Sequence, residues 1–201
     1  MLSSETALLL VGYQNDYFGE TGLLQQVVEE SSKVNNTIAN TVLTIAHLPE
    51  YVPVVTTPIH FTPTYEELID PVGILKMIKD LGAFQAGTEG AKTIAPLLHF
   101  GDRIIDVHGK RGFNAFAHTN LDRLLRQKGV TRVVIGGAIT SICIDSTGRC
   151  AHELGYQVSI LSDCTAARTI FEQDFYCQHI FPTYAEVLNH QEFLNHFTVA
   201  A

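Results

Sequence analysis

The sequence lacks the features that mark several large classes of protein. No apolar run approaches the roughly 18 residues that cross a membrane, and the first residues show no basic stretch followed by an apolar core. We therefore expect neither a membrane partner nor a signal peptide. Only 13 lysine and arginine residues stand against 21 acidic ones, for a net charge of -8. Without a basic cluster to follow a phosphate backbone, a nucleic-acid partner is not expected.

Cysteine is also scarce, and its spacing fits neither a disulfide framework nor a zinc site. The four cysteines contain no C-x-x-C pair, so we expect free thiols in a reducing, cytoplasmic compartment. No G-x-G-x-x-G sequence follows any strand-like run, which argues against a bound nucleotide. We expect no cofactor and no metal ion. The cysteines are Cys143, Cys150, Cys164 and Cys177.

What the chain does have is a regular alternation of strand and helix patterns. Helical spacing of apolar residues covers 27–47, 119–128 and 140–154. The alternation predicts one α/β domain over residues 1–201, in which helices cover both faces of a mostly parallel six-stranded sheet in three layers. The stretch 58–101, rich in proline and glycine, is expected to build a pocket wall. The six strand-like runs are 6–11, 52–57, 103–107, 132–136, 157–162 and 184–188.

Four chemically distinctive positions follow four of these runs. They are Gly12, His60, Lys110 and Cys143. In an open parallel sheet, ligands bind beyond the carboxyl ends of the strands, near a change in strand order. The sequence therefore predicts that these four segments meet at one edge of the sheet.

Cys143 lies where a buried strand ends in the turn Gly136–Gly137 and a helix begins. Free N–H groups and the positive end of a helix dipole favour a thiolate there, and the same N–H groups can bind an oxyanion. The alternative is that Cys143 is a small apolar residue that fills the strand–helix junction.

Three segments together resemble the signature of the isochorismatase-like cysteine hydrolases. Residues 12–18, after the run 7–11, resemble D-x-Q-N-D-F. Residues 110–116 resemble K-x-x-x-S-A-F, with T-x-L at 119–121, and residues 138–143 resemble G-V/A-x-T-x-x-C. Their order and internal spacing match, and three motifs in order at strand ends are far more specific than one.

The resemblance implies roles for three parts of the site. Cys143 would be the nucleophile that forms a thioester with the substrate. Lys110 would lie near the thiolate and steady the oxyanion, although most lysines are simply surface residues. The peptide between Ala138 and Ile139 would be cis, and the N–H groups of Ile139 and Cys143 would form the oxyanion hole.

Gly12 departs from the family pattern, because the family has its general-base aspartate at this position. The glycine is a natural loss that leaves a weak enzyme or a binding protein, an engineered removal of the base, or a sign that another group replaces it. Water held by Gln14 or Asn15 is one such replacement. If only the base is missing, Gly12→Asp should raise hydrolysis about 10²-fold or more.

The resemblance also indicates a pocket wall, although aromatic residues at such positions are often ordinary core. His60 is a candidate for this wall, or a histidine at the surface. Nicotinamidases of this family bind a metal with D-x-H at this point, but Pro58 replaces that aspartate here, so no metal site is expected. The candidate substrate-binding residues are Gln14, Tyr17, Phe18, His60, Phe113, Phe116 and Tyr176.

These observations favour hydrolysis of a C–N bond in a small amide, ureide or imide-like molecule through a Cys143 thioester. The alternative is a catalytically inactive protein on the same fold that binds a small molecule, a reading that Gly12 supports. We also expect a homodimer or homotetramer, with the apolar segment 180–187 as a candidate contact surface. The sequence leaves the substrate open.

We predict that Cys143 is the most reactive of the four cysteines, because its place at a helix start and Lys110 both stabilise the thiolate. Limited labelling with iodoacetamide at about pH 7, followed by peptide mapping, measures this. Preferential labelling of Cys150, Cys164 or Cys177 would contradict the assignment of the nucleophile.

Overall fold

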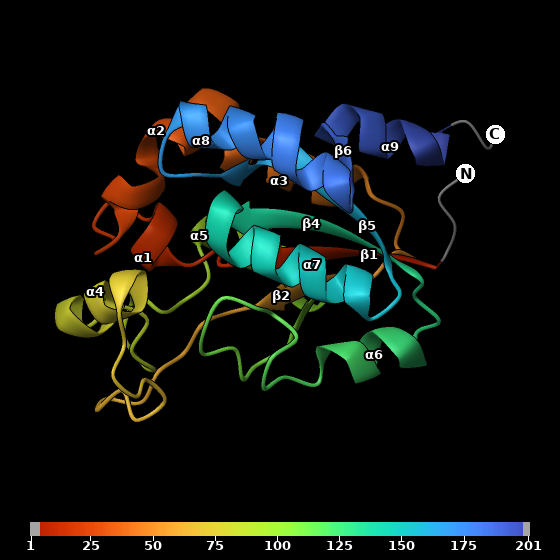
Figure 1. Cartoon of the computed structure of the whole chain (residues 1–201). Coiled ribbons are helices and arrows are strands. Elements are labelled where there is room, and N and C mark those ends of the chain that lie inside the picture. Colours follow the sequence, from red (N-terminus) through yellow and green to blue (C-terminus); the bar gives the residue numbers. More distant parts are fainter. Residues whose placement is uncertain (1–4, 199–201) are drawn as a thin grey trace.

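The computed structural model describes residues 5–198 and places six strands in one sheet. The strand order is β3-β2-β1-β4-β5-β6, and every neighbouring pair is parallel (Figure 1). The expected α/β fold is confirmed, and the sheet is parallel throughout. The strands are β1 (Thr6–Val11), β2 (Val54–Thr57), β3 (Ile104–Asp106), β4 (Arg132–Ala138), β5 (Gln157–Ala166) and β6 (Glu186–Leu188).

The helices differ from the expected pattern at two places. The helix expected over 27–47 is two helices, because Asn36 between them adopts the left-handed conformation with φ 52°, which asparagine tolerates better than most residues. The helix expected over 140–154 begins with a π-helical turn, η2 (Thr140–Ile144). The helices are α1 (Asn15–Phe18), α2 (Gln25–Asn35), α3 (Thr37–His47), α4 (Gly73–Leu81), α5 (Ala95–Leu98), η1 (Gly101–Arg103), α6 (Leu121–Gln127), α7 (Asp145–Glu153), α8 (Ile170–Phe175), η3 (Tyr176–Ile180), η4 (Phe181–Thr183) and α9 (His190–Thr198).

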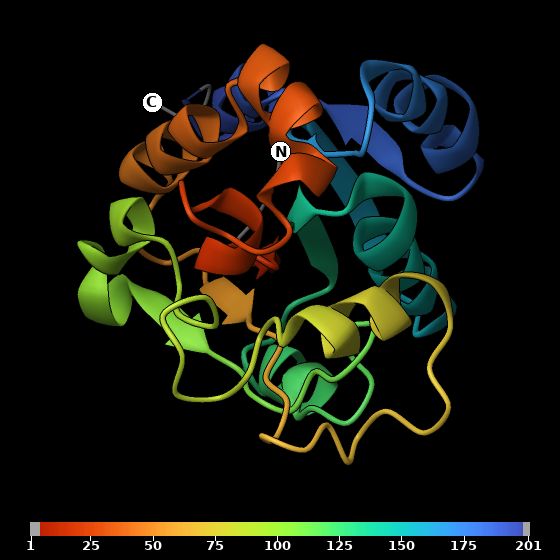
Figure 2. The same ribbon diagram turned by 90° about the vertical axis from the view of Figure 1, so that its left-hand side faces the viewer.

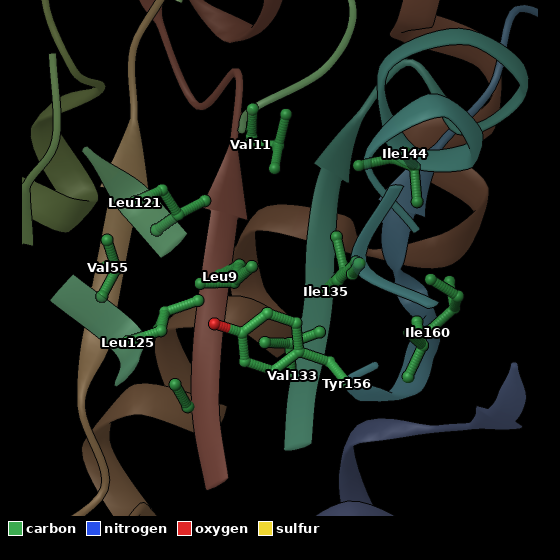
Figure 3. Packing of buried hydrophobic residues seen from close by; sticks show 14 of the residues in the cluster. Leu9, Val11, Val55, Leu121, Leu125, Val133, Ile135, Ile144, Tyr156 and Ile160 are labelled. Atoms are coloured by element: carbon green, nitrogen blue, oxygen red, sulfur yellow. The ribbon is translucent and has the colours of Figure 1, made fainter. Parts of the chain in front are cut away.

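Two hydrophobic cores cover the two faces of the sheet. On one face, Leu9 and Val11 pack against α6 and α7 (Figure 3). On the other face, Leu8 and Leu10 pack against α3, α5 and α9. Because successive strand residues point to opposite faces and both faces are buried, the strands read as continuous apolar runs.

The order of the strands reverses between β1 and β4. The chain adds β2 and β3 on one side of β1, and β5 and β6 on the far side of β4. The carboxyl ends of β1 and β4 are therefore the switch point at which open α/β sheets bind ligands. Figure 2 faces this edge, with α4 in front of it.

The segment 180–187, expected as a contact surface, is partly used inside its own chain. Phe181 is fully buried, and Val187 packs against the core below α7. The large exposed side chains nearby are Phe171 and Phe175 of α8, which are 79% and 41% exposed. The homo-oligomer stays a prediction. Within residues 5–198, no helix has the length and apolar character needed to span a bilayer.

We predict that Gly137→Ala destabilises the protein much more than Gly155→Ala. Both glycines have positive φ, 129° and 88°, and an alanine in that region costs about 1–2 kcal/mol on backbone grounds. A Cβ on Gly137 would also lie 1.8 Å from the carbonyl oxygen of Val11, whereas a Cβ on Gly155 would meet nothing within 4 Å. In urea unfolding, we expect Gly137→Ala to lower the free energy of unfolding by more than about 4 kcal/mol. Equal losses would show that β1 and β4 are not packed this closely.

Candidate active site

Cys143 lies in η2, immediately beyond the carboxyl end of β4, and is only 2% exposed. The Ala138–Ile139 peptide bond that joins β4 to this turn is cis, as the family resemblance implies. The strand, the turn and the cysteine thus form one continuous segment at the switch point.

Lys110 brings a buried amine to the same place from the loop that follows β3. Its backbone forms a parallel bridge with Ile59, and its side chain is fully buried. The Lys110 Nζ donates a hydrogen bond to the carbonyl oxygen of Gly112 and lies 3.7 Å from the Sγ of Cys143. Burial lowers the pKa of Lys110 below its usual value, and the negative charge available at Cys143 opposes that shift. This amine can therefore exchange a proton with the thiol.

Gly12 follows β1 with φ 75°, where residues with a side chain are disfavoured. A Cβ there would lie 2.9 Å from the carbonyl oxygen of Ala138 and 3.5 Å from the ring of Tyr17. The nearby Asp16 does not replace the missing acid, because its carboxylate accepts hydrogen bonds from the backbone N–H groups of Phe84, at 2.6 Å, and Leu23, at 3.3 Å. The structure therefore changes the expectation for Gly12→Asp, since this backbone leaves little room for a carboxylate.

A small internal cavity of about 10 Å³ lies against Cys143. Its volume is close to that of one water molecule, so a substrate enters only if part of the wall moves. The wall is almost entirely apolar, with α4 and Phe113 on its outer side. The residues that line it are Tyr17, Ile59, Phe61, Ile74, Leu75, Ile78, Gly112, Phe113, Ile142 and Cys143.

Tyr17 and Phe113 line this cavity. Gln14 and His60, which are also expected to bind the substrate, do not. Gln14 binds backbone instead: its Nε2 donates to the carbonyl oxygens of Ile59 and Ala91 at 2.8 and 2.7 Å, and its Oε1 accepts from the N–H of Ile59 at 2.8 Å. Gln14 therefore holds the wall in place and has no free amide for the substrate.

His60 lies outside the cavity lining, because its neighbours Ile59 and Phe61 point into the cavity and successive residues of an extended segment alternate in direction. It stacks on His108 with ring centroids 5.6 Å apart. Burial, followed by the charge of His108, lowers the pKa of His60. His60 is thus a neutral residue behind the wall at physiological pH.

Three further expected binding residues also lie elsewhere. Phe18 stacks on Tyr13 at 5.3 Å, and Phe116 stacks on Tyr156 at 6.0 Å. Tyr176 lines a separate, open hollow of about 640 Å³, which shares only Ile142 with the cavity of Cys143. These aromatic residues are core or surface residues in this chain.

Sequence reasoning located the pocket wall but missed most of its members. The expectation that 58–101 builds a wall is consistent with the lining by Ile59, Phe61 and α4. The apolar spacing of Ile74, Leu75 and Ile78 was visible, but an amphipathic helix turns the same face to any core.

The surroundings of two of the other thiols favour their protonated forms. Burial raises the pKa of both Cys164 and Cys177 to about 12, which keeps these two protonated.

Within the described part of the chain, no group of three or more histidine, cysteine or acidic side chains could hold a metal ion.

Known proteins resemble the chain in sequence and in fold. The uncharacterized isochorismatase family protein YecD of Escherichia coli O157:H7 is 36% identical over 86 residues, which are 43% of this chain and 46% of that protein. The match thus spans less than half the length of that relative.

Solved structures match over nearly the whole chain. A cysteine hydrolase from Pseudomonas syringae pv. phaseolicola superposes with a TM-score of 0.84 at 19% identity, covering 100% of this chain and 96% of that one. The N-carbamoylsarcosine amidase from Thermoplasma acidophilum gives 0.73 at 24% identity, covering 94% and 98%. At these identities the likeness shows the fold. The isochorismatase domain family matches residues 6–192, so the chain belongs to the isochorismatase family.

Proposed function

We propose that this protein is a cysteine-dependent hydrolase that cleaves a C–N bond in a small amide, ureide or imide. The observation that carries the proposal is the 3.7 Å approach of the buried Lys110 Nζ to the Cys143 Sγ at the switch point, beside the apolar cavity that Cys143 lines. A buried amine and a buried thiol in direct contact are arranged for nucleophilic catalysis.

We propose further that Lys110 is the base in this chain, since residue 12 carries no carboxylate. Burial disfavours the charged form of Lys110 and lowers its pKa, so its amine is the group beside the sulfur that can accept a proton. The Cys143 thiol transfers its proton to the Lys110 Nζ, which leaves a thiolate beside an ammonium group. Each charge then has a partner within the apolar surroundings.

The remaining steps return both groups to their starting state. The thiolate attacks the carbonyl carbon, and the C–N bond breaks as the Lys110 ammonium gives its proton to the leaving nitrogen. Water then attacks the thioester and gives one proton to Lys110. The carbon–sulfur bond breaks, and Lys110 returns the proton to the sulfur of Cys143.

The cavity wall supports a substrate whose acyl part is small and apolar. Aliphatic and aromatic side chains from Ile59, Phe61, α4 and Phe113 surround the sulfur, and burying a charged group against them would be costly. The fold neighbour named as an amidase agrees with cleavage of a C–N bond.

The second candidate is a protein that binds a small molecule without turning it over. The missing carboxylate at Gly12 favours this alternative. The positive φ, and the 2.9 Å that would separate a Cβ from the Ala138 carbonyl oxygen, mean that an aspartate fits there only if the backbone shifts. The two candidates differ in whether hydrolysis depends on Cys143.

We predict that Cys143→Ala reduces hydrolysis of small amides to the background rate, and that Lys110→Arg lowers kcat/KM by about 10²-fold or more. Arginine keeps the positive charge but cannot act as a base. Lys110→Met is the matched control, since it removes the amine and its burial cost together, so its thermal stability should stay the same or rise.

Two outcomes would contradict these roles. Activity close to wild type in a folded Lys110→Arg variant would show that Lys110 acts through charge alone. Hydrolysis that persists in Cys143→Ala would remove the proposed function. If the wild-type protein binds amides but turns over none across a panel of amides, ureides and imides, the binding protein replaces the hydrolase.

We predict that Gly12→Asp lowers thermal stability and leaves hydrolysis unchanged or weaker, because its Cβ would press on the Ala138 carbonyl oxygen. Gly12→Ala should lose a similar amount of stability, roughly 1–2 kcal/mol or more, since backbone and Cβ are common to both. A large gain in kcat/KM for Gly12→Asp alone would show that the backbone adapts and that only the base is missing.

A further inference from the structure

Tyr17 is the aromatic residue of α1 that closes the inner side of the Cys143 cavity. It is 1% exposed, and its ring packs against that of Phe84 with centroids 4.9 Å apart. Its backbone N–H donates to the carbonyl oxygen of Gln14 at 3.0 Å. The ring is thus fixed from its own helix turn and from the segment opposite.

The hydroxyl of Tyr17 has no hydrogen-bond partner within residues 5–198, although buried phenols normally have one. Tyr13, four residues earlier, shows the usual arrangement. Its hydroxyl donates to the carbonyl oxygen of Cys164 at 2.7 Å and lies 2.5 Å from Thr41 Oγ1. The contrast marks the Tyr17 hydroxyl as a donor without a partner among the described residues, on a residue that lines the Cys143 cavity and also a second hollow beside α2.

Electrostatics keep this hydroxyl protonated. Burial, and then the negative charge available at Cys143 and at Asp16, raise the pKa of Tyr17 well above its usual value. A phenol in this state donates a hydrogen bond and does not ionise at physiological pH. Tyr17 therefore adds a neutral donor near a thiolate without adding a competing anion.

The reacting amide already has partners in the proposed function. Its carbon meets Cys143, and its nitrogen receives a proton from Lys110. The rest of the wall is aliphatic or aromatic, apart from the backbone of Gly112. A donor left over in such a wall binds either the single water for which the cavity has room or a further acceptor on the substrate. A substrate that displaces the water without offering that acceptor would leave the donor unpaired.

We propose that the Tyr17 hydroxyl donates a hydrogen bond to a second acceptor next to the scissile carbonyl, and thereby selects imides and ureides over simple amides. The proposal rests on the proposed function and deepens it. No proton is transferred from Tyr17. The family motif quoted above has phenylalanine at this position, so the hydroxyl belongs to this chain's own version of the site.

The test compares two compounds that differ in that acceptor alone. Diacetamide has two carbonyl groups on one nitrogen, and N-ethylacetamide has a methylene in place of one of them. Each is used to protect Cys143 from alkylation by iodoacetamide, followed by peptide mapping, in the wild-type protein, in Tyr17→Phe and in Tyr13→Phe. Protection measures binding at the cavity and does not require turnover.

We expect diacetamide to protect the wild-type protein at about 3- to 10-fold lower concentration than N-ethylacetamide, the usual value of one neutral hydrogen bond. The ratio of the protective concentration of N-ethylacetamide to that of diacetamide should fall to about 1 in Tyr17→Phe and persist in Tyr13→Phe. Tyr13→Phe should lower the melting temperature, because it leaves buried partners unpaired, whereas Tyr17→Phe should not.

A ratio that persists in Tyr17→Phe, or a wild-type ratio of about 1, would overturn the role of Tyr17. Neither result bears on the proposed function, which stands or falls with the loss of hydrolysis in Cys143→Ala. A failure of the role of Tyr17 can therefore be told apart from a failure of the proposed function.

Discussion

The contact between the Lys110 amine and the Cys143 thiol is the interaction on which the rest of the site depends. A lone ammonium group with no exposure to water would cost several kcal/mol, and this one has a backbone carbonyl and a sulfur atom as its polar neighbours. Because position 12 holds no carboxylate, the sulfur is the group that can supply the balancing negative charge. In the proposed function, one proton passes between these two groups.

The sheet brings this pair together from distant parts of the sequence. Lys110 follows β3 at one side of the sheet, and Cys143 follows β4 at its centre. The reversal of strand order between β1 and β4 leaves room at the carboxyl ends of these strands, where the two side chains meet. Close packing makes this possible, since Gly137 lies against the Val11 carbonyl where no side chain would fit. The end of β1 is also close to β4 at position 12, since a Cβ on Gly12 would lie 2.9 Å from the Ala138 carbonyl oxygen.

Much of the fold could be predicted from the sequence, because a parallel sheet buried on both faces leaves continuous apolar runs such as 6–11 and 132–136. The meeting of Lys110 and Cys143 at one edge of the sheet could be predicted as well, since their motifs lie at strand ends. The break at Asn36 could not, because helical spacing continues across it and a single left-handed residue leaves no periodic signal. The roles of Gln14, His60 and Phe116 could not either, because a motif fixes a position along the chain but not the direction in which a side chain points.

The hydrogen bonds of Gln14 have a consequence for how this site can change. They fix the two ends of the segment 59–91, at Ile59 and Ala91, to the end of β1. The part between these ends carries α4, which supplies Ile74, Leu75 and Ile78 to the wall and none of the reacting groups. Substitutions in α4 can therefore reshape the space beside the sulfur while the attachment points and the proton-sharing pair stay as they are. For the proposed hydrolase, this means that selectivity and reactivity would be carried by separately anchored parts of the molecule.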